Sequence, residues 1–112
     1  MRPMDIYVAA VPFDDKDTSK LRPALVVKVS NSRVNVFKIT TKYKKKSKKI
    51  KKFYYPIKEW TEAGLREQSY VDVHRTYNIS QRVIFSKKPI GKLTSLDILE
   101  LFKFIQDIQK KN

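Results

Sequence analysis

Residues 24–41 read ALVVKVSNSRVNVFKITT, and this stretch decides the fold of the chain. Residues 24–29 are an almost unbroken apolar run, which is typical of a buried strand, and residues 33–41 are typical of a second strand. Residues 30–32 between them are Ser, Asn and Ser, which favour a tight turn. We therefore predict a β-hairpin.

The second arm of this hairpin has apolar and polar residues on both of its faces. Alternation along a strand places Val34, Val36, Lys38 and Thr40 on one face, and Asn35, Phe37, Ile39 and Thr41 on the other. Because neither face is wholly polar, the pattern leaves open which of them is buried.

Four further segments are predicted to be strands: residues 5–11, 53–57, 68–73 and 82–85. Pro12 ends the first of them, and the polar residues 13–22 that follow are typical of a long loop. Residues 59–64 are predicted to form one helical turn, which Gly64 closes.

The C-terminal residues 94–111 have the clearest pattern in the chain. Apolar residues recur there at helical spacing and predict one buried face, made of Ile98, Leu101, Phe102, Ile105 and Ile108. Thr94 stands in the position of an N-cap, and Asp97 in the first turn suits the positive end of the helix dipole. Leu93 is expected to pack against Ile98.

These elements predict a mainly β fold with a C-terminal helix (α+β). Short strands without crossover helices between them favour a small, strongly curved antiparallel sheet, either open or closed into an SH3-like barrel. A length of 112 residues is typical of one domain, so we expect a single domain over residues 1–112.

The composition excludes several classes of protein. The chain has 25 Lys and Arg against 11 Asp and Glu, a formal net charge of +14 at pH 7. It has no Cys and one His, which excludes a disulfide framework and thiolate chemistry and argues against a metal centre. The longest apolar stretch, residues 6–13, is too short to span a membrane. We expect a cytoplasmic protein without metal or cofactor.

Residues 42–52 form a lysine run, in which eight of the eleven residues are Lys. Such a run is either a solvated loop or an electrostatic arm for a polyanion. Aromatic residues within and beside it, Tyr43, Phe53, Tyr54 and Tyr55, favour nucleic acid as the partner. A membrane surface fits less well, since the run lacks the apolar stripe of an interfacial helix. A nuclear-localisation signal remains an alternative for the same lysines.

RNA cleavage is chemically open to a chain of this composition, because the 2′-hydroxyl of RNA can attack the adjacent phosphate without a metal ion. The protein must then supply proton transfer and donors for the charge that develops on phosphorus. Arg22, beside Pro23 at the end of the predicted loop, suits bidentate phosphate contact. An ordinary surface arginine is an equal alternative.

His74 is the only histidine and a candidate proton shuttle. On a strand, Tyr70, Asp72 and His74 share one face, whereas Val71 and Val73 point the other way. Asp72 would raise the pKa of His74 if the two were close, or it pairs instead with a neighbouring Lys or Arg. The alternative for His74 is a hydrogen-bonded surface residue.

Several motifs together resemble the MazF/PemK family of toxin endoribonucleases. The most specific is SKLRPALVV at residues 19–27; the others are residues 5–7, 11–13, 64–65, 69–71 and 90–93. The resemblance spans nearly the whole chain. It implies an SH3-like barrel toxin, usually a homodimer, that cleaves single-stranded RNA without metal and is neutralised by an antitoxin peptide.

The resemblance also implies site residues. The family's catalytic arginine before the proline falls on Arg22, with roles in proton transfer and in stabilising the phosphorane. Its catalytic threonine falls on Thr40, or on Thr41 if the register slips by one, and would hydrogen-bond a phosphate oxygen. RNA is expected to enter between residues 13–21 and the lysine run. The predicted RNA contacts are Lys20, Lys42, Tyr43, Lys44, Lys45, Lys46, Lys48, Lys49 and Tyr54, with bases stacking on Tyr43 or Tyr54.

The chain departs from the family pattern at four places, one of which is the lysine run itself, which is unusual for the family and suggests either stronger RNA attraction or a different ligand. Met4 stands where the family usually has Gly before the first Asp, and residues 13–21 lack the glycines that many members carry. Some members use an Arg and an Asp on the strand that here carries Asp72 and His74, so that form of the site does not transfer. A non-catalytic nucleic-acid-binding barrel and a protein-interaction module remain alternatives to the enzyme.

Overall fold

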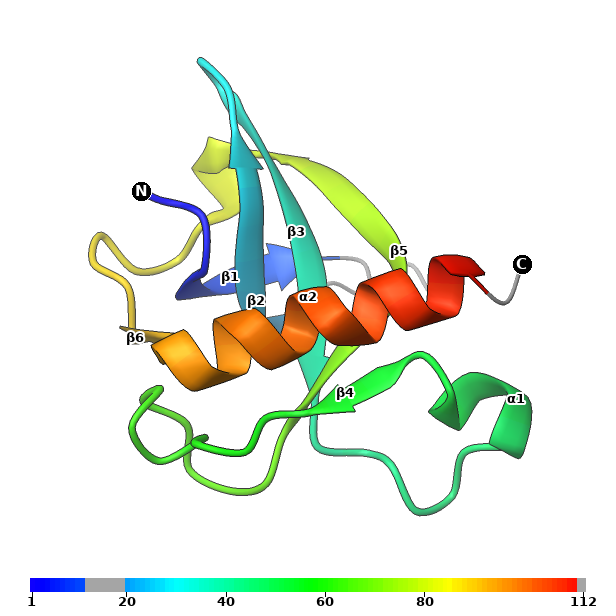
Figure 1. Ribbon diagram of the computed structural model, residues 1–112. Coiled ribbons are helices and arrows are strands. Elements are labelled where there is room, and N and C mark those ends of the chain that lie inside the picture. The colour runs from blue at the N-terminus through cyan, green and yellow to red at the C-terminus, as the bar shows by residue number, and fades with distance from the viewer. Residues whose placement is uncertain (12–19, 111–112) are drawn as a thin grey trace.

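Six antiparallel strands form one curled sheet, against which a long helix packs (Figure 1). The computed structural model describes residues 1–11 and 20–110. In chain order the elements are β1 (Asp5–Val11), β2 (Lys20–Val29), β3 (Arg33–Thr40), α1 (Lys48–Lys51), β4 (Tyr54–Pro56), β5 (Tyr70–Ser80), the 3-10 helix η1 (Gln81–Val83), β6 (Gly91–Lys92) and α2 (Ser95–Lys110). The strand order is β4-β5-β3-β2-β1-β6. The predicted fold, mainly β with a C-terminal helix, is confirmed.

The predicted hairpin is formed by β2 and β3, and both of its faces are buried. Phe37 and Ile39 belong to a core cluster that includes Leu101 of α2. Val34 and Val36, on the opposite face, pack in a second cluster with Ile79 of β5, and Val83 of η1 lies against it. The sequence left open which face of β3 is buried, and the structure shows that both are. The helix α2 covers the face of Phe37 and Ile39, and the curl of the sheet covers the face of Val34 and Val36.

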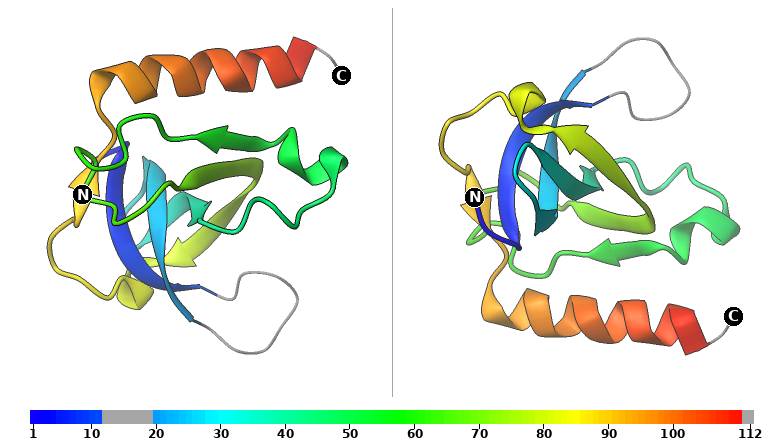
Figure 2. Two further views of the ribbon diagram at one scale, coloured as in Figure 1. Left: turned by 90° about the horizontal axis from the view of Figure 1, so that it is seen from below. Right: turned by 90° about the horizontal axis from the view of Figure 1, so that it is seen from above.

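The sheet is curled but not closed into a barrel, so of the two predicted forms the open one is observed (Figure 2). Its edge strands are β4, with three residues, and β6, with two. No ladder joins these edges within the described part of the chain. Strands this short offer too few backbone groups to pair across the remaining gap.

The strand prediction for residues 82–85 was wrong. The chain forms the short helix η1 there, followed by a single bridge between Ile84 and Ala9. The strand predicted to end at residue 73 instead continues as β5 to Ser80 and pairs with β3 along its length, across a bulge between Val36 and Lys38. Residues 74–76 are exposed, so this half of β5 lacks the apolar alternation that would have revealed it.

The predicted C-terminal helix is confirmed as α2. Thr94 Oγ1 accepts a hydrogen bond from the Asp97 N–H at 3.4 Å, as an N-cap does. The inward placement of Phe102 was wrong, since 53% of this residue is exposed. Phe104 packs inward instead, with its ring centroid 5.6 Å from that of Tyr55. Within residues 1–11 and 20–110, no helix combines the length and apolarity needed to cross a membrane.

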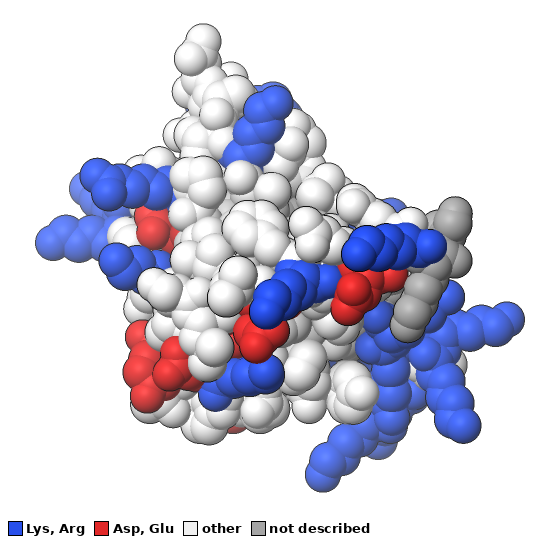
Figure 3. Space-filling view, in the orientation of Figure 1, with Lys and Arg blue, Asp and Glu red and all other residues white. Residues whose placement is uncertain are grey.

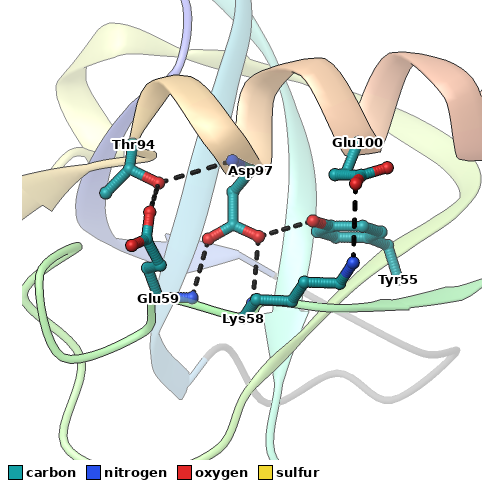
Figure 4. Close-up of polar contacts among 6 residues, drawn as sticks. All are labelled: Tyr55, Lys58, Glu59, Thr94, Asp97 and Glu100. Atoms are coloured by element: carbon teal, nitrogen blue, oxygen red, sulfur yellow. Dashed lines mark hydrogen bonds and ion pairs between the residues drawn. The ribbon is translucent and has the colours of Figure 1, made fainter.

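Asp97 ties α2 to the segment after β4 (Figure 4). It is fully buried, and its carboxylate accepts hydrogen bonds from the Tyr55 hydroxyl at 2.5 Å and from the N–H groups of Lys58 and Glu59 at 2.9 and 2.8 Å. Burial, together with the hydrogen bond to Asp97, raises the pKa of Tyr55 far above its ordinary value, so that this hydroxyl remains a donor. The carboxylate predicted to suit the helix dipole is thus a buried anchor.

The two glycines of the chain meet where the turn before β5 crosses β6. Gly64 has φ +90°, a left-handed conformation that favours glycine, and it closes the predicted turn. A Cβ on Gly91 would lie 1.8 Å from the Ala63 carbonyl oxygen. Met4, at the family's usual glycine position, also has positive φ, 74°. The backbone there keeps the conformation that glycine would favour.

Gly91→Ala is expected to lower the free energy of unfolding by about 1–3 kcal/mol, because the added methyl group overlaps a backbone oxygen that is fixed by its own turn. Urea denaturation measures this change. Lys92→Ala, at the exposed neighbouring position, serves as the control and should stay near the wild type. Equal midpoints for Gly91→Ala and the wild type would contradict the tight contact.

Candidate functional site

The pairing of the central strands places Arg22, Thr40 and Tyr70 in one row across the sheet. Ala24 of β2 and Lys38 of β3 form the last pair of their ladder, and continuing its antiparallel register by two residues aligns Arg22 with Thr40. Thr40 in turn pairs with Tyr70 of β5. Paired strands lie about 4.8 Å apart, so Thr40 and Tyr70 are immediate cross-strand neighbours, and Arg22 lies across from Thr40 just beyond the end of the β2–β3 ladder.

Arg22 and Thr40 also share a face of the sheet. Alternation puts Arg22 on the side of Ala24, and Thr40 on the side of Lys38 and Val36; these faces coincide because Ala24 and Val36 pack in the same cluster. Thr41 lies one residue beyond the end of β3 and is exposed. The geometry therefore brings Thr40, rather than Thr41, beside Arg22.

The Thr40 side chain is held in place by a local hydrogen bond. The residue is 7% exposed, and its Oγ1 accepts a hydrogen bond from the Lys42 N–H at 3.1 Å. A hydroxyl that accepts in this way keeps its own proton available for donation. Arg22 beside it is partly buried. A fixed alcohol and a guanidinium thus lie together at the end of two rigid strands.

A buried ion pair lies next to Thr40 on the same face. Lys38 Nζ is 3.6 Å from Asp72 Oδ2, with the two side chains 8% and 13% exposed. Of the two alternatives for Asp72, pairing with a basic neighbour is the one observed. The other Asp72 oxygen, Oδ1, accepts a hydrogen bond from the His74 backbone N–H, not from its ring.

His74 is not brought together with Arg22 and Thr40. It lies four residues along β5 from Tyr70, a distance of about 14 Å at the rise of a strand. Its ring packs on Phe53, with 4.5 Å between centroids, and the residue is exposed. The geometry matches the alternative of a surface histidine.

Tyr43 joins the lysine run to the row of site residues. Its ring stacks on that of Tyr70 at 4.3 Å between centroids and 6° between planes, and Lys51 Nζ lies 4.8 Å from the Tyr43 centroid. The Tyr43–Tyr70 stack was not predicted, because it depends on how the loop after β3 returns to β5.

The prediction that a base stacks on Tyr54 needs correction. Tyr54 is 4% exposed, so its ring offers no open face to a base.

The lysine run forms a basic projection between β3 and β4 (Figure 3). It contains the single helical turn α1, whose N-cap is Ser47. The exposed lysines of the run are Lys42, Lys44, Lys45, Lys48, Lys49 and Lys52, whereas Lys46 and Lys51 are partly buried. Lys20 begins β2, but its side chain lies outside the described residues, as do residues 12–19 of the predicted RNA entrance.

Two cavities lie between these groups and the segment before β5. The larger, about 750 Å³, is lined by Thr41, Lys42, Tyr43, Lys44, Lys45, Lys46, Glu67, Gln68 and Tyr70. The smaller, about 380 Å³, is lined by Val8, Pro23, Thr41, Gly64, Leu65, Arg66, Glu67, Ser69 and Ile90. Both include Thr41 and Glu67, so the cavities adjoin. Together they lead from Pro23, next to Arg22, to the lysine run.

The sequence matches a known protein family over nearly its whole length. The model of a family described as "PemK-like, MazF-like toxin of type II toxin-antitoxin system" matches residues 2–108. The chain belongs to this toxin family. A search of curated proteins finds no match.

Among solved structures, the chain is similar to Mycobacterium tuberculosis toxin MazF-mt6, with a TM-score of 0.68 and 21% identity. The alignment covers 92% of this chain and 93% of that one. This likeness confirms the fold, and the family match confirms the resemblance read from the sequence motifs. Across the described residues, no three His, Asp or Glu side chains gather where they could hold a metal ion.

The Lys38–Asp72 pair is expected to stabilise the sheet beside the site. Asp72→Asn should lower the free energy of unfolding by about 3 kcal/mol, since the buried ammonium loses its carboxylate. Lys58 and Glu100 form a matched control pair, also 3.6 Å apart but 53% and 31% exposed, and Glu100→Gln should cost about 0.5 kcal/mol. Urea denaturation of both variants tests this, and equal losses would contradict the role of burial.

Proposed function

We propose that this toxin is an endoribonuclease that cleaves single-stranded RNA without a metal ion. The observation that carries the proposal is the placement of Arg22 opposite Thr40 on one face of the sheet. Beside them lies the buried Lys38, whose Nζ is 3.6 Å from Asp72 Oδ2. A site of this kind supplies what a reaction with a built-in nucleophile requires, namely fixed donors and positive charge around one phosphate.

In the proposed reaction, the 2′-oxygen attacks the adjacent phosphorus and the bond from phosphorus to the 5′-oxygen breaks. The 2′-hydroxyl loses its proton and the leaving 5′-oxygen gains one, so the products are a 2′,3′-cyclic phosphate and a 5′-hydroxyl. Arg22 stabilises the charge on the phosphorane and takes part in the proton transfer. Thr40 donates a hydrogen bond to a phosphate oxygen. We leave Thr41 and His74 out of the reacting groups, because neither shares the face and row of Arg22.

RNA binding is assigned to the lysine run and the cavities beside it. Lys42, Lys44, Lys45, Lys46, Lys48 and Lys49 would contact phosphates, together with Lys20. Tyr43, already stacked on Tyr70, would offer its edge or exchange that partner for a base. The larger cavity, of about 750 Å³, has room for a nucleotide.

The family also suggests partners. We propose a cognate antitoxin peptide, whose acidic groups would suit a chain of net charge +14, and a location in the cytoplasm. A homodimer is supported by three exposed apolar residues spaced three apart along α2, Leu96, Leu99 and Phe102.

Cleavage of a long single-stranded RNA in the presence of EDTA tests the catalytic proposal. Arg22→Ala is expected to slow cleavage by about 10²–10³-fold, because it removes the donor that stabilises the transition state. Thr40→Val should slow it by about tenfold or more, whereas Thr41→Val stays near the wild type. The products are examined for 2′,3′-cyclic phosphate ends, and circular dichroism confirms that each variant is folded.

Two outcomes would reject this assignment. RNA binding without any cleavage by the wild type would support the non-catalytic nucleic-acid-binding alternative. A loss of activity in Thr41→Val but not in Thr40→Val would move the catalytic hydroxyl to the exposed position.

The lysine run is tested separately through the salt dependence of binding. If five of its lysines contact phosphates, replacing Lys44, Lys45, Lys46, Lys48 and Lys49 by Ser should reduce the slope of log K against log salt by about 3.5. The exposed Lys28, Lys103 and Lys110 lie outside the run, and replacing them should change the slope little. An unchanged slope in the five-lysine variant would show that the run is only a solvated loop.

A further inference from the structure

A second group of cations lies at the edge of the sheet opposite the lysine run. The space-filling view shows Lys and Arg side chains gathered over the segment between η1 and β6, on the left of Figure 3. Lys87, Lys88 and Lys92 of this part of the chain are exposed, and residues 82–92 contain no acidic residue. Phe85, in the same segment, is 69% exposed, more than any other large apolar residue among those described.

This segment is held against β1 by backbone hydrogen bonds. The Phe85 N–H donates to the Val8 carbonyl at 2.7 Å, and the Ile90 N–H donates to the Ile6 carbonyl at 2.8 Å. Lys92, in β6, pairs with Asp5 of β1. Phe85 and the three lysines are therefore anchored at or near a sheet edge.

The register connects this edge to the candidate site. Ile84, next to Phe85, forms a bridge with Ala9, and Ala9 pairs with Arg22. The row that runs through Arg22, Thr40 and Tyr70 thus extends to Ile84, and its four interstrand steps follow the curled sheet over a path of about 19 Å. The lysine run lies at one end of this row and Phe85 at the other, with Arg22 between them.

We propose that Phe85, Lys87, Lys88 and Lys92 form a second basic surface that binds the same single-stranded RNA on the other side of the scissile phosphate. A base stacks on the exposed ring of Phe85, and the lysines neutralise neighbouring phosphates. The inference rests on the RNA binding proposed above. That proposal placed RNA at the lysine run, and this one adds contacts at Phe85, at the other end of the row.

The surroundings of Phe85 favour RNA over a protein partner. An aromatic ring among cations is the combination with which proteins bind single strands, because each base has a face to stack and each phosphate a charge. On its C-terminal side the ring is followed by Ser86 and by two exposed cations, Lys87 and Lys88. The row length also suits a single strand, since small single-strand-binding folds cover about 4–16 nucleotides.

The test is a binding measurement on the full chain. The probe is a fluorescein-labelled oligouridine of about 12 nucleotides, a length within the range of such sites, with 2′-O-methyl groups that block cleavage. Phe85→Ala is expected to weaken binding about tenfold at fixed salt, by loss of one stacked base. The double variant Lys87→Ser with Lys88→Ser should reduce the slope of log K against log salt by about 1.4.

A matched control comes from α2. Lys103→Ser with Lys110→Ser removes two exposed charges that lie outside both basic surfaces, and this change should alter neither the affinity nor the slope. If the wild type binds the probe and the Phe85 and Lys87/Lys88 variants bind it equally well with the same slope, the second surface is refuted. An altered oligomeric mass in Phe85→Ala with unchanged RNA binding would likewise refute it and identify a protein contact.

One further result would contradict the proposed function itself. If the wild type does not bind the probe, RNA binding itself is rejected, and the second surface with it. The two failures are distinguishable. Refuting the second surface alone requires a wild type that binds the probe, whereas rejecting RNA binding requires a wild type that does not bind it.

Discussion

The antiparallel register between β2 and β3 is the constraint on which the candidate site depends. It sets Arg22 opposite Thr40, and the pairing of β3 with β5 adds Tyr70 to the same row. A slip of one residue between β2 and β3 would reverse the face of every side chain on one strand and separate the guanidinium from the hydroxyl. The register is thus held by the apolar cores on both faces of the hairpin, because a slip would move Phe37 and Val36 each out of its own cluster and into the other, where different side chains pack.

The order of the strands places the two groups of exposed lysines near opposite edges of the sheet. The lysine run connects β3 to β4 at one edge, and the second basic surface precedes and includes β6 at the other. Arg22 lies on β2, near the middle of the strand order. Arg22 therefore lies between the two basic edges along the strand order, and the interior Lys38 is paired there with Asp72, with 3.6 Å between Lys38 Nζ and Asp72 Oδ2.

The frame around the site is held by contacts far from it in the sequence. Asp97 joins α2 to the segment after β4 through the Tyr55 hydroxyl and two backbone N–H groups. Gly64 and Gly91 allow the turn before β5 to approach β6 more closely than any side chain would permit. Residues from three of the motifs that carry the family resemblance, Pro23, Gly64 with Leu65, and Ile90, line the smaller cavity together.

The amino-acid sequence by itself determined the hairpin, the strand β1, the C-terminal helix and the family, because alternation, turn residues and motif spacing are local properties. Arg22 and Thr40 were named through the resemblance, and only the tertiary structure shows that Thr40 lies within β3 in the row of Arg22, whereas Thr41 lies beyond the strand. Burial of Tyr54, exposure of Phe102 and the second half of β5 also escaped prediction. Each of these depends on which distant segment covers a residue, and such long-range packing is settled by the sum of contacts over the folded chain, not by the pattern of its neighbours.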